Sequence, residues 1–220
     1  RVIFSNIRKF IVFLLSGNVG AILIVGLAML FGSILPLLPL QILYLNMISD
    51  VFPALALGVG KGEPSVMDRP PRPASEPVVT KTLWMIIVGY GLLIAGTALT
   101  GFWISLEKMS LSGERAVTIT FLILAFTRTW HVFNMRDAKS SVIFNDVTRN
   151  PFVWGAVILS IVLLLFAVYF PPLSRVLTMV VPTPFQWLFI LGMSFIPLVV
   201  VQILKQGTFF YKETQEKRSK

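Results

Sequence analysis

Residues 10–49 read FIVFLLSGNVGAILIVGLAMLFGSILPLLPLQILYLNMIS, a run of 40 residues without a charged side chain. A helix needs about 20 apolar residues to cross roughly 30 Å of hydrocarbon, so this run is long enough for two membrane-spanning helices. Pro36 and Pro39 lie near its end, and proline interrupts a helix because it lacks a backbone N–H. The run therefore predicts helices at about 7–34 and 38–58, joined by a tight turn.

The composition of the whole chain also indicates a membrane protein. Of its 220 residues, 55% are hydrophobic and 13% are charged, and the mean hydropathy is +0.82. Soluble domains carry about 25% charged residues, and a soluble core of this size could not bury so much apolar surface. The chain has no cysteine, which excludes disulfides and thiolate metal sites. Its net charge of +9 is divided among segments between apolar blocks, so we expect no nucleic acid partner.

Further charge-free intervals predict the remaining spans. These intervals lie between Lys81 and Glu107, between Arg149 and Arg175, and between Arg175 and Lys205. Together with an apolar segment that carries Arg128, they predict helices at about 82–105, 115–135, 152–171 and 185–205. We therefore expect an all-α fold, a polytopic bundle of six transmembrane helices embedded in a lipid bilayer.

Basic residues gather on one side of this predicted bundle. An even number of spans places both termini on the same side as the loops at about 59–81 and 136–150. That side holds 15 of the 19 Lys and Arg residues, an excess that is typical of cytosolic loops. We expect a multi-pass membrane protein with both termini in the cytosol. The loop 59–81 contains five prolines, which predicts an extended cytosolic connector.

Asp50 lies near the middle of the second predicted span, where a carboxylate is costly unless it has a function or a partner. Asn46 precedes it by one helical turn, so both side chains project from one face. Ser49 is adjacent, and Pro53 frees the backbone carbonyl four residues earlier. These oxygen donors are the ligands that Ca²⁺ and other hard cations prefer. The pattern predicts a cation site; the alternative is a buried aspartate that only holds helices together.

Asn18 and Arg128 are polar groups in two other spans. Asn18 lies between Gly17 and Gly20, small residues that allow another helix to approach, so it could contact an ion or only bridge helices. Arg128 lies eight residues before Arg136, roughly 12 Å deep at about 1.5 Å per residue. It could extend back to the cytosolic interface, or point inward and neutralise Asp50 as an internal cation. His131 follows on the same face and is expected to be a packing residue.

Motifs of soluble enzymes are absent from the sequence, including the P-loop, His-Glu-x-x-His and Gly-x-Ser-x-Gly. We therefore expect no catalytic residue and no cofactor-binding residue within this chain.

Four segments carry a resemblance to a known family: SGNVG at 16–20, LLPLQILYLNMISD at 37–50, FPALALG at 52–58 and MDRPPR at 67–72. The first three resemble the last six membrane helices of P-type cation-transporting ATPases, and the fourth matches a loop of the calcium-pump branch. The resemblance extends over nearly the whole chain and weakens after about residue 110. The chain also opens at Arg1 without an initiator Met, so we expect a piece of a longer polypeptide.

The resemblance implies the C-terminal membrane half of a cation pump. In that family ATP and Mg²⁺ act through cytosolic domains that this chain lacks, so the implied partners are those domains and the N-terminal helices of the same pump. Asn18, Asn46 and Asp50 match positions that bind the metal cation, and Ser49 stands where a Thr ligand often stands.

Two departures from the family pattern bear on the cation. Ala21 replaces a Glu of the two-site calcium pumps, and Arg128 stands where that branch has Glu, Gln or Asp. An unpaired Arg would repel a second divalent ion, so we expect at most one ion per cycle. The resemblance favours Ca²⁺, and H⁺ transport by an Asp50–Arg128 pair is the alternative. A stand-alone membrane scaffold without transport is a further alternative.

Overall fold

The computed structural model describes residues 1–32, 34–61, 77–137 and 140–218, and within these ranges every regular element is a helix. Six stretches are long and apolar enough to cross a membrane, which confirms the predicted all-α fold with six spans. Residues 62–76, which include most of the predicted connector and the MDRPPR segment, lie outside the described ranges. The elements are α1 (Val2–Leu30), α2 (Pro39–Leu45), η1 (Asn46–Asp50), α3 (Val51–Gly58), α4 (Lys81–Trp103), η3 (Ile104–Lys108), α5 (Gly113–His131), η4 (Val132–Met135), α6 (Pro151–Tyr169), α7 (Pro171–Val176) and α8 (Pro184–Arg218).

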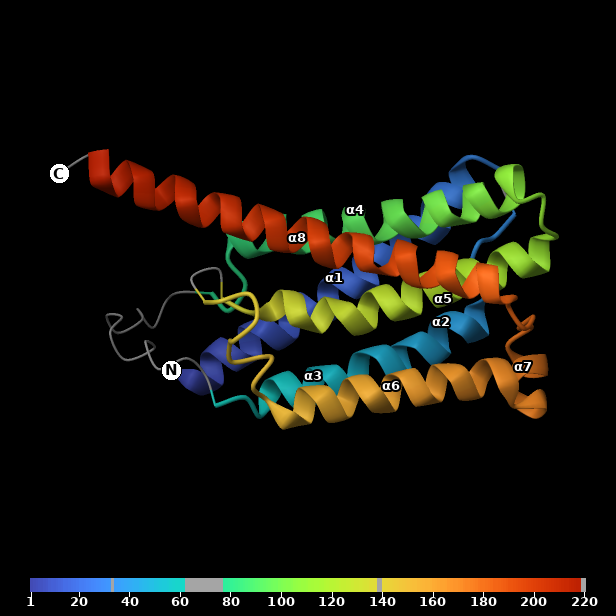
Figure 1. Ribbon diagram of the computed structural model, residues 1–220, viewed down its shortest axis with the longest axis horizontal. Coiled ribbons are helices and arrows are strands. Elements are labelled where there is room, and N and C mark those ends of the chain that lie inside the picture. The colour runs from blue at the N-terminus through green and yellow to red at the C-terminus, as the bar shows by residue number, and fades with distance from the viewer. Residues whose placement is uncertain (33, 62–76, 138–139, 219–220) are drawn as a thin grey trace.

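The long helices run side by side, and α5 is the central one (Figure 1). It packs against α4, α8 and α6, while α1 packs against α4 and α3 packs against α1 and α6. Side chains on every face of α5 are buried, among them Phe121, Leu122 and Ile123. The start of α1 and the end of α8 lie at the same end of the bundle, as an even number of spans requires.

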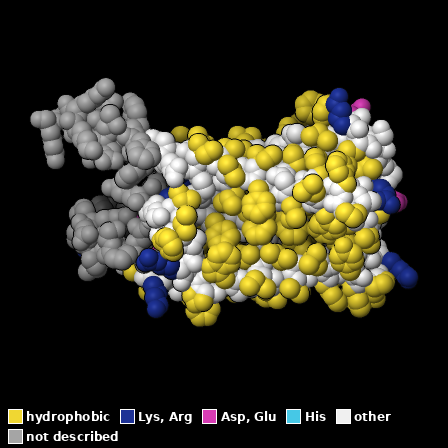
Figure 2. All heavy atoms as spheres, viewed as in Figure 1, with side chains coloured by type: hydrophobic (Ala, Val, Ile, Leu, Met, Phe, Trp, Pro, Cys, Tyr) yellow, Lys and Arg dark blue, Asp and Glu magenta, His cyan; other side chains and the backbone are white. Residues whose placement is uncertain are grey.

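The outer surface of the bundle is apolar. Large hydrophobic side chains such as Ile22, Leu55 and Leu188 are mostly exposed in the isolated chain. Figure 2 shows hydrophobic side chains over the middle of one face, with Lys and Arg side chains toward the two ends. A surface of this kind suits contact with lipid tails, so the chain is a multi-pass integral membrane protein.

The second span is interrupted in its middle. α2 is followed by the π-helical turn η1 over Asn46–Asp50 and then by α3. Pro53 lies in the first turn of α3 and has no N–H to offer the carbonyl of Ser49, which disfavours a regular α-helix at this point. Wider π-helical turns accommodate such a mismatch and are frequent at functional sites. The irregular turn therefore coincides with the residues predicted to bind a cation.

Several helices end at residues other than those predicted. α1 ends at Leu30, four residues early, because Gly32 turns the chain with a φ of +62°. α6 ends at Tyr169 because Pro171 and Pro172 lack backbone N–H groups, and the separate helix α7 begins there. The backbone of α8 continues to Arg218, well beyond the predicted residue 205.

Candidate functional site

Arg128 lies at the centre of a buried polar cluster. Its side chain extends from α5, and the residue is only 1% exposed. Its Nη2 atom donates to Oδ2 of Asp50 and to Oδ1 of Asn18, each at 2.9 Å. Its Nη1 atom donates to Oδ1 of Asn46 at 3.2 Å. The guanidinium therefore points inward and does not extend to the membrane boundary, which decides between the two orientations left open by the sequence.

The acceptors of this guanidinium come from two different spans. Asn18 lies on α1, whereas Asn46 and Asp50 begin and end the π-helical turn η1. The turn sets the relative position of Asn46 and Asp50, so that both side chains reach Arg128. Three of the four predicted ligand positions thus converge on one positively charged group.

Ser49, the fourth predicted ligand, is fully buried on the same turn. Its Oγ atom has no hydrogen-bond partner among the described residues. A buried hydroxyl without a hydrogen-bond partner is costly. The Ser49 hydroxyl is therefore suited to bind a ligand or to gain a partner in another conformation. Ser160 on α6 donates to the carbonyl of Ile48 at 3.3 Å, so a neighbouring helix satisfies one backbone group of this turn.

Gly17 makes room for Arg128. A Cβ atom at this position would lie 2.7 Å from Nε and 2.8 Å from Nη2 of Arg128, closer than non-bonded atoms approach. The Nε atom has no hydrogen-bond partner among the described residues, so the guanidinium is held at its two terminal nitrogens. The absence of a side chain at Gly17 therefore allows α1 to approach the guanidinium closely.

A second polar cluster follows the first toward the end of the bundle where both termini lie. Ser16 on α1 lies 2.9 Å from Nε2 of His131, and Asn134 on η4 lies 3.2 Å from its Nδ1. Gln202 on α8 donates to Oδ1 of Asn134 at 2.9 Å and accepts from Arg136 at 2.6 Å. These contacts join the first, fourth and sixth spans, which are distant in the sequence. The contacts of Ser16 and Gln202 could not be predicted from the sequence, because a single polar residue in an apolar helix does not identify its partner.

The side chains around Arg128 can bind one positively charged group. They combine one carboxylate, two amide oxygens and one hydroxyl within apolar helices. Nowhere in the described ranges do three His, Cys, Asp or Glu side chains gather as metal ligands. With a single carboxylate, these side chains balance the charge of one guanidinium or contribute part of the shell of a larger ion.

Known proteins resemble this chain over most of its length. Residues 34–207 match the family model described as "Cation transporting ATPase, C-terminus". The calcium-transporting ATPase of Bacillus subtilis (strain 168) is 40% identical over 197 residues, which cover 90% of this chain and 22% of that protein. Calcium-transporting ATPase 1 of Bacillus cereus (strain ATCC 10987 / NRS 248) is 34% identical over 219 residues, covering 93% and 25%. The human calcium-transporting ATPase type 2C member 1 is 31% identical over 204 residues, covering 93% and 22%. The chain thus spans a quarter or less of the length of these curated relatives.

Proposed function

The chain belongs to the family of cation-transporting ATPase C-termini, and we propose that it is the ion-translocating membrane module of an ATP-driven P-type cation pump. The names of its relatives support Ca²⁺ as the transported cation. One Ca²⁺ or similar cation per cycle binds at a site centred on Asp50, with Asn18, Asn46 and Ser49 as further oxygen donors.

One observation carries this proposal: the oxygens of Asn18, Asn46 and Asp50 meet at a single positive group in the middle of the bundle. A charged group at this depth is expensive, and ionisable residues inside membrane spans mark ion pathways and proton relays. The irregular turn η1 adds loosened backbone carbonyls beside these side chains, as in other membrane ion sites.

Arg128 limits how many cations the module can hold. Its guanidinium stands between α1 and η1, where it holds the same oxygens that are proposed to bind the transported cation. Bringing a divalent ion beside it in a medium of low dielectric costs several kcal/mol. Arg128 therefore acts as an internal counter-cation, and it moves away from Asp50 when the transported cation binds.

The ion pair between Arg128 and Asp50 favours proton transport as the second candidate. Their closest atoms are 2.9 Å apart and both side chains are buried. In a proton pump, Asp50 would take up H⁺ on one side of the membrane, and Arg128 would expel the proton on the other side.

Other segments of a longer protein supply the remaining parts of the proposed pump. Cytosolic domains bind ATP with Mg²⁺ and form the phosphorylated intermediate, and N-terminal helices complete the cation site. Both termini of this chain and the loops at 59–81 and 136–150 face the cytosol, because these segments hold most of the basic residues.

The replacement Asp50→Asn tests the site in the full-length pump. It removes the one carboxylate while keeping the size of the side chain, so Ca²⁺-dependent phosphorylation should fall at least 100-fold. ATP-driven ⁴⁵Ca²⁺ uptake into vesicles should fall in parallel. If ATP drives the uptake of H⁺ and not of ⁴⁵Ca²⁺ into vesicles that contain the wild type, the proton alternative replaces the calcium proposal.

Asp146→Asn is the matched control, because it makes the same chemical change at a carboxylate that pairs with Lys9 outside the cluster. Uptake by this variant should stay within about twofold of the wild type. Wild-type transport by Asp50→Asn would show that Asp50 is no ligand of the transported cation.

A further inference from the structure

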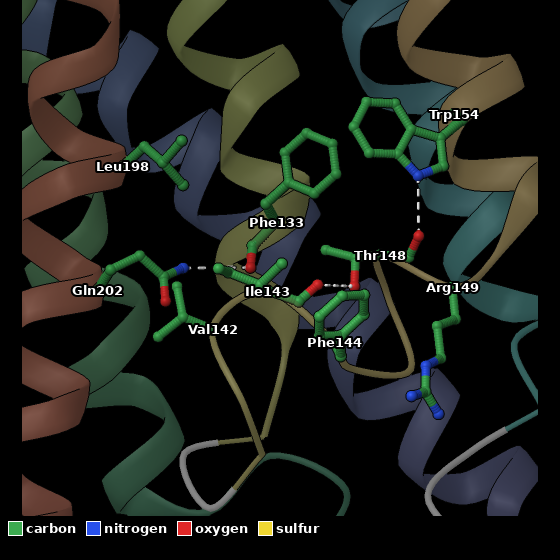
Figure 3. Close-up of a pocket in the computed structure, with 9 residues that line it drawn as sticks. All are labelled: Phe133, Val142, Ile143, Phe144, Thr148, Arg149, Trp154, Leu198 and Gln202. Atoms are coloured by element: carbon green, nitrogen blue, oxygen red, sulfur yellow. Dashed lines mark hydrogen bonds between the residues drawn. The ribbon is translucent and has the colours of Figure 1, made fainter.

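An open cavity of about 540 Å³ lies between η4, the loop before α6, the first turn of α6 and the middle of α8. Its volume falls within the roughly 300–1,000 Å³ that is typical of sites for small ligands. Figure 3 shows that α8 forms one wall with Leu198 and Gln202, while Trp154 of α6 stands on the opposite side. Most of the lining is apolar, and it includes one basic and no acidic residue.

The cavity lies at the level where the spans end. Phe133 belongs to η4, the last turn of the fourth span, and Trp154 lies in the first turn of α6. The indole of Trp154 lies 5.2 Å from the ring of Phe133, and its Nε1 donates to the carbonyl of Thr148 at 2.8 Å. Tryptophan with one apolar and one hydrogen-bonded edge is typical of the boundary between lipid tails and headgroups.

The loop that borders the cavity exposes apolar side chains although it is outside the spans. Ile143 and Phe144 are 69% and 67% exposed. The loop is held in shape by its own hydrogen bonds: Asn145 accepts from the backbone of Thr148, and the Thr148 hydroxyl donates to the carbonyl of Ile143. An ordered loop that presents large apolar groups beside the membrane boundary is suited to contact with lipid tails.

Arg149 supplies the positive charge at this cavity. Its guanidinium lies 5.9 Å from the centre of the Phe144 ring, and Figure 3 shows the side chain extending past the loop, away from Trp154. Arginine matches the geometry and charge of a phosphate group, and its position next to an apolar cavity matches a molecule with a charged head and a long tail.

We propose that this cavity binds an anionic phospholipid from the surrounding bilayer. One acyl chain lies against Phe133, Trp154 and Leu198, and the phosphate pairs with Arg149. The site depends on the membrane location of the chain and not on which cation is transported, so it stands apart from the proposed transport function.

Tryptophan quenching in the purified full-length protein tests this site. Phosphatidylglycerol with brominated acyl chains is added to the detergent-solubilised protein, and phosphatidylcholine with the same chains is the neutral counterpart. Brominated phosphatidylglycerol should quench a component of the fluorescence at a mole fraction at least fivefold lower than brominated phosphatidylcholine. Trp154→Phe should remove this component, because Trp154 forms part of the cavity wall.

The variant Arg149→Gln should abolish the preference, so that both lipids quench at the same mole fraction. Arg175→Gln is the matched control, since Arg175 lies on α7 at the other end of the bundle, and it should keep the preference. An unchanged quenching curve with brominated phosphatidylcholine shows that each of the two arginine variants is folded, because Trp84 and Trp103 are exposed on α4.

Three results would overturn the proposal. The first is equal quenching by the two lipids in the wild type, and the second is a preference that survives Arg149→Gln or Trp154→Phe. The third is displacement of brominated phosphatidylglycerol by glycerol 1-phosphate at constant ionic strength, which would indicate a site for a soluble anion. A cavity covered by another part of the full-length protein would give the first result, since no lipid could then reach Trp154.

Discussion

Gly17 lies on α1 beside the guanidinium of Arg128. In a Gly17→Ala variant the new methyl group would overlap Nε and Nη2, so Arg128 must leave Asn18 or Asp50, or α1 must move. Crowding of this kind typically costs about 1–3 kcal/mol. We expect a lower unfolding temperature and at least a tenfold change in the Ca²⁺ concentration that half-activates phosphorylation of the full-length pump.

Gly26→Ala is the control on the same helix, because no heavy atom lies within 4 Å of the position of its Cβ. Alanine stabilises a helix interior by about 1 kcal/mol relative to glycine, so this variant should unfold at an equal or higher temperature. Identical Ca²⁺ activation of both variants would mean that the position of Arg128 has no effect on the site.

Removal of Arg128 separates its structural role from its role toward the cation. Arg128→Ala leaves the buried Asp50 carboxylate without its partner, and breaking a buried ion pair costs about 3–5 kcal/mol. The double variant Asp50→Asn/Arg128→Ala removes both charges and should recover most of this loss in thermal unfolding. The single variant, where it folds, should change the number of Ca²⁺ ions bound per phosphorylated pump. An unchanged number and affinity would restrict Arg128 to a structural role.

The sequence predicted which residues form the cluster better than it predicted their contacts. The one-turn spacing of Asn46 and Asp50 in an apolar helix identified both residues as candidates. Asn18 was identified because it is a polar residue between two glycines. The direction of Arg128 could not be predicted, because a side chain at that depth can reach either the membrane boundary or the interior. The role of Gly17 depends on which helix faces it, and a single sequence does not contain that information.

At the scale of the element, Pro53 maintains the irregular turn in the second span. Pro53→Ala supplies the missing N–H for the carbonyl of Ser49, so a regular helix becomes more favourable by up to about 3 kcal/mol. We expect an increased unfolding temperature together with at least a fivefold loss of ATP-driven Ca²⁺ uptake in the full-length pump. The reason is that a regular helix would rotate Asn46 relative to Asp50.

Pro197→Ala makes the same change inside α8, away from the cluster, and should leave uptake within about twofold of the wild type. Equal losses of uptake in both proline variants would show that the effect is general to the spans and is not connected with η1.

Charge-free intervals located five of the six spans, because a charge in lipid is costly, and the fourth was located from its apolar residues although it carries Arg128. The residues at which the helices end depend on glycine and proline instead. Gly32 ended α1 through a positive φ, and Pro171 and Pro172 ended α6. The π-helical form of η1 could not be read from the sequence, since proline in a helix also produces simple kinks.

At the scale of the whole molecule, the predicted orientation can be tested by single cysteines, because this chain has none of its own. Lys61→Cys lies on the side with most basic residues, and Arg175→Cys lies at the opposite end. A membrane-impermeant maleimide should label Lys61→Cys only from the cytosolic side and Arg175→Cys only from the other side. The reverse pattern would contradict the assignment from charge.

The sequence predicted the number of spans and that successive spans cross the membrane in opposite directions. It did not predict that α5 would be the central helix, because spans that are neighbours in the chain need not be neighbours in space.

The burial of α5 on all sides has a consequence for biosynthesis. This span has the lowest mean hydropathy of the six and carries Arg128, yet 89% of an 18-residue apolar stretch within it is buried in the protein. Left alone in the translocon, such a segment would partition poorly into lipid, because an arginine at the helix centre opposes insertion by about 2.5–3.5 kcal/mol. We therefore expect its integration to depend on the earlier helices that carry Asn18, Asn46 and Asp50, because these residues accept hydrogen bonds from the guanidinium in the folded protein. The ion pair between Arg128 and Asp50 would then require the first two spans to be in place before the fourth enters the membrane.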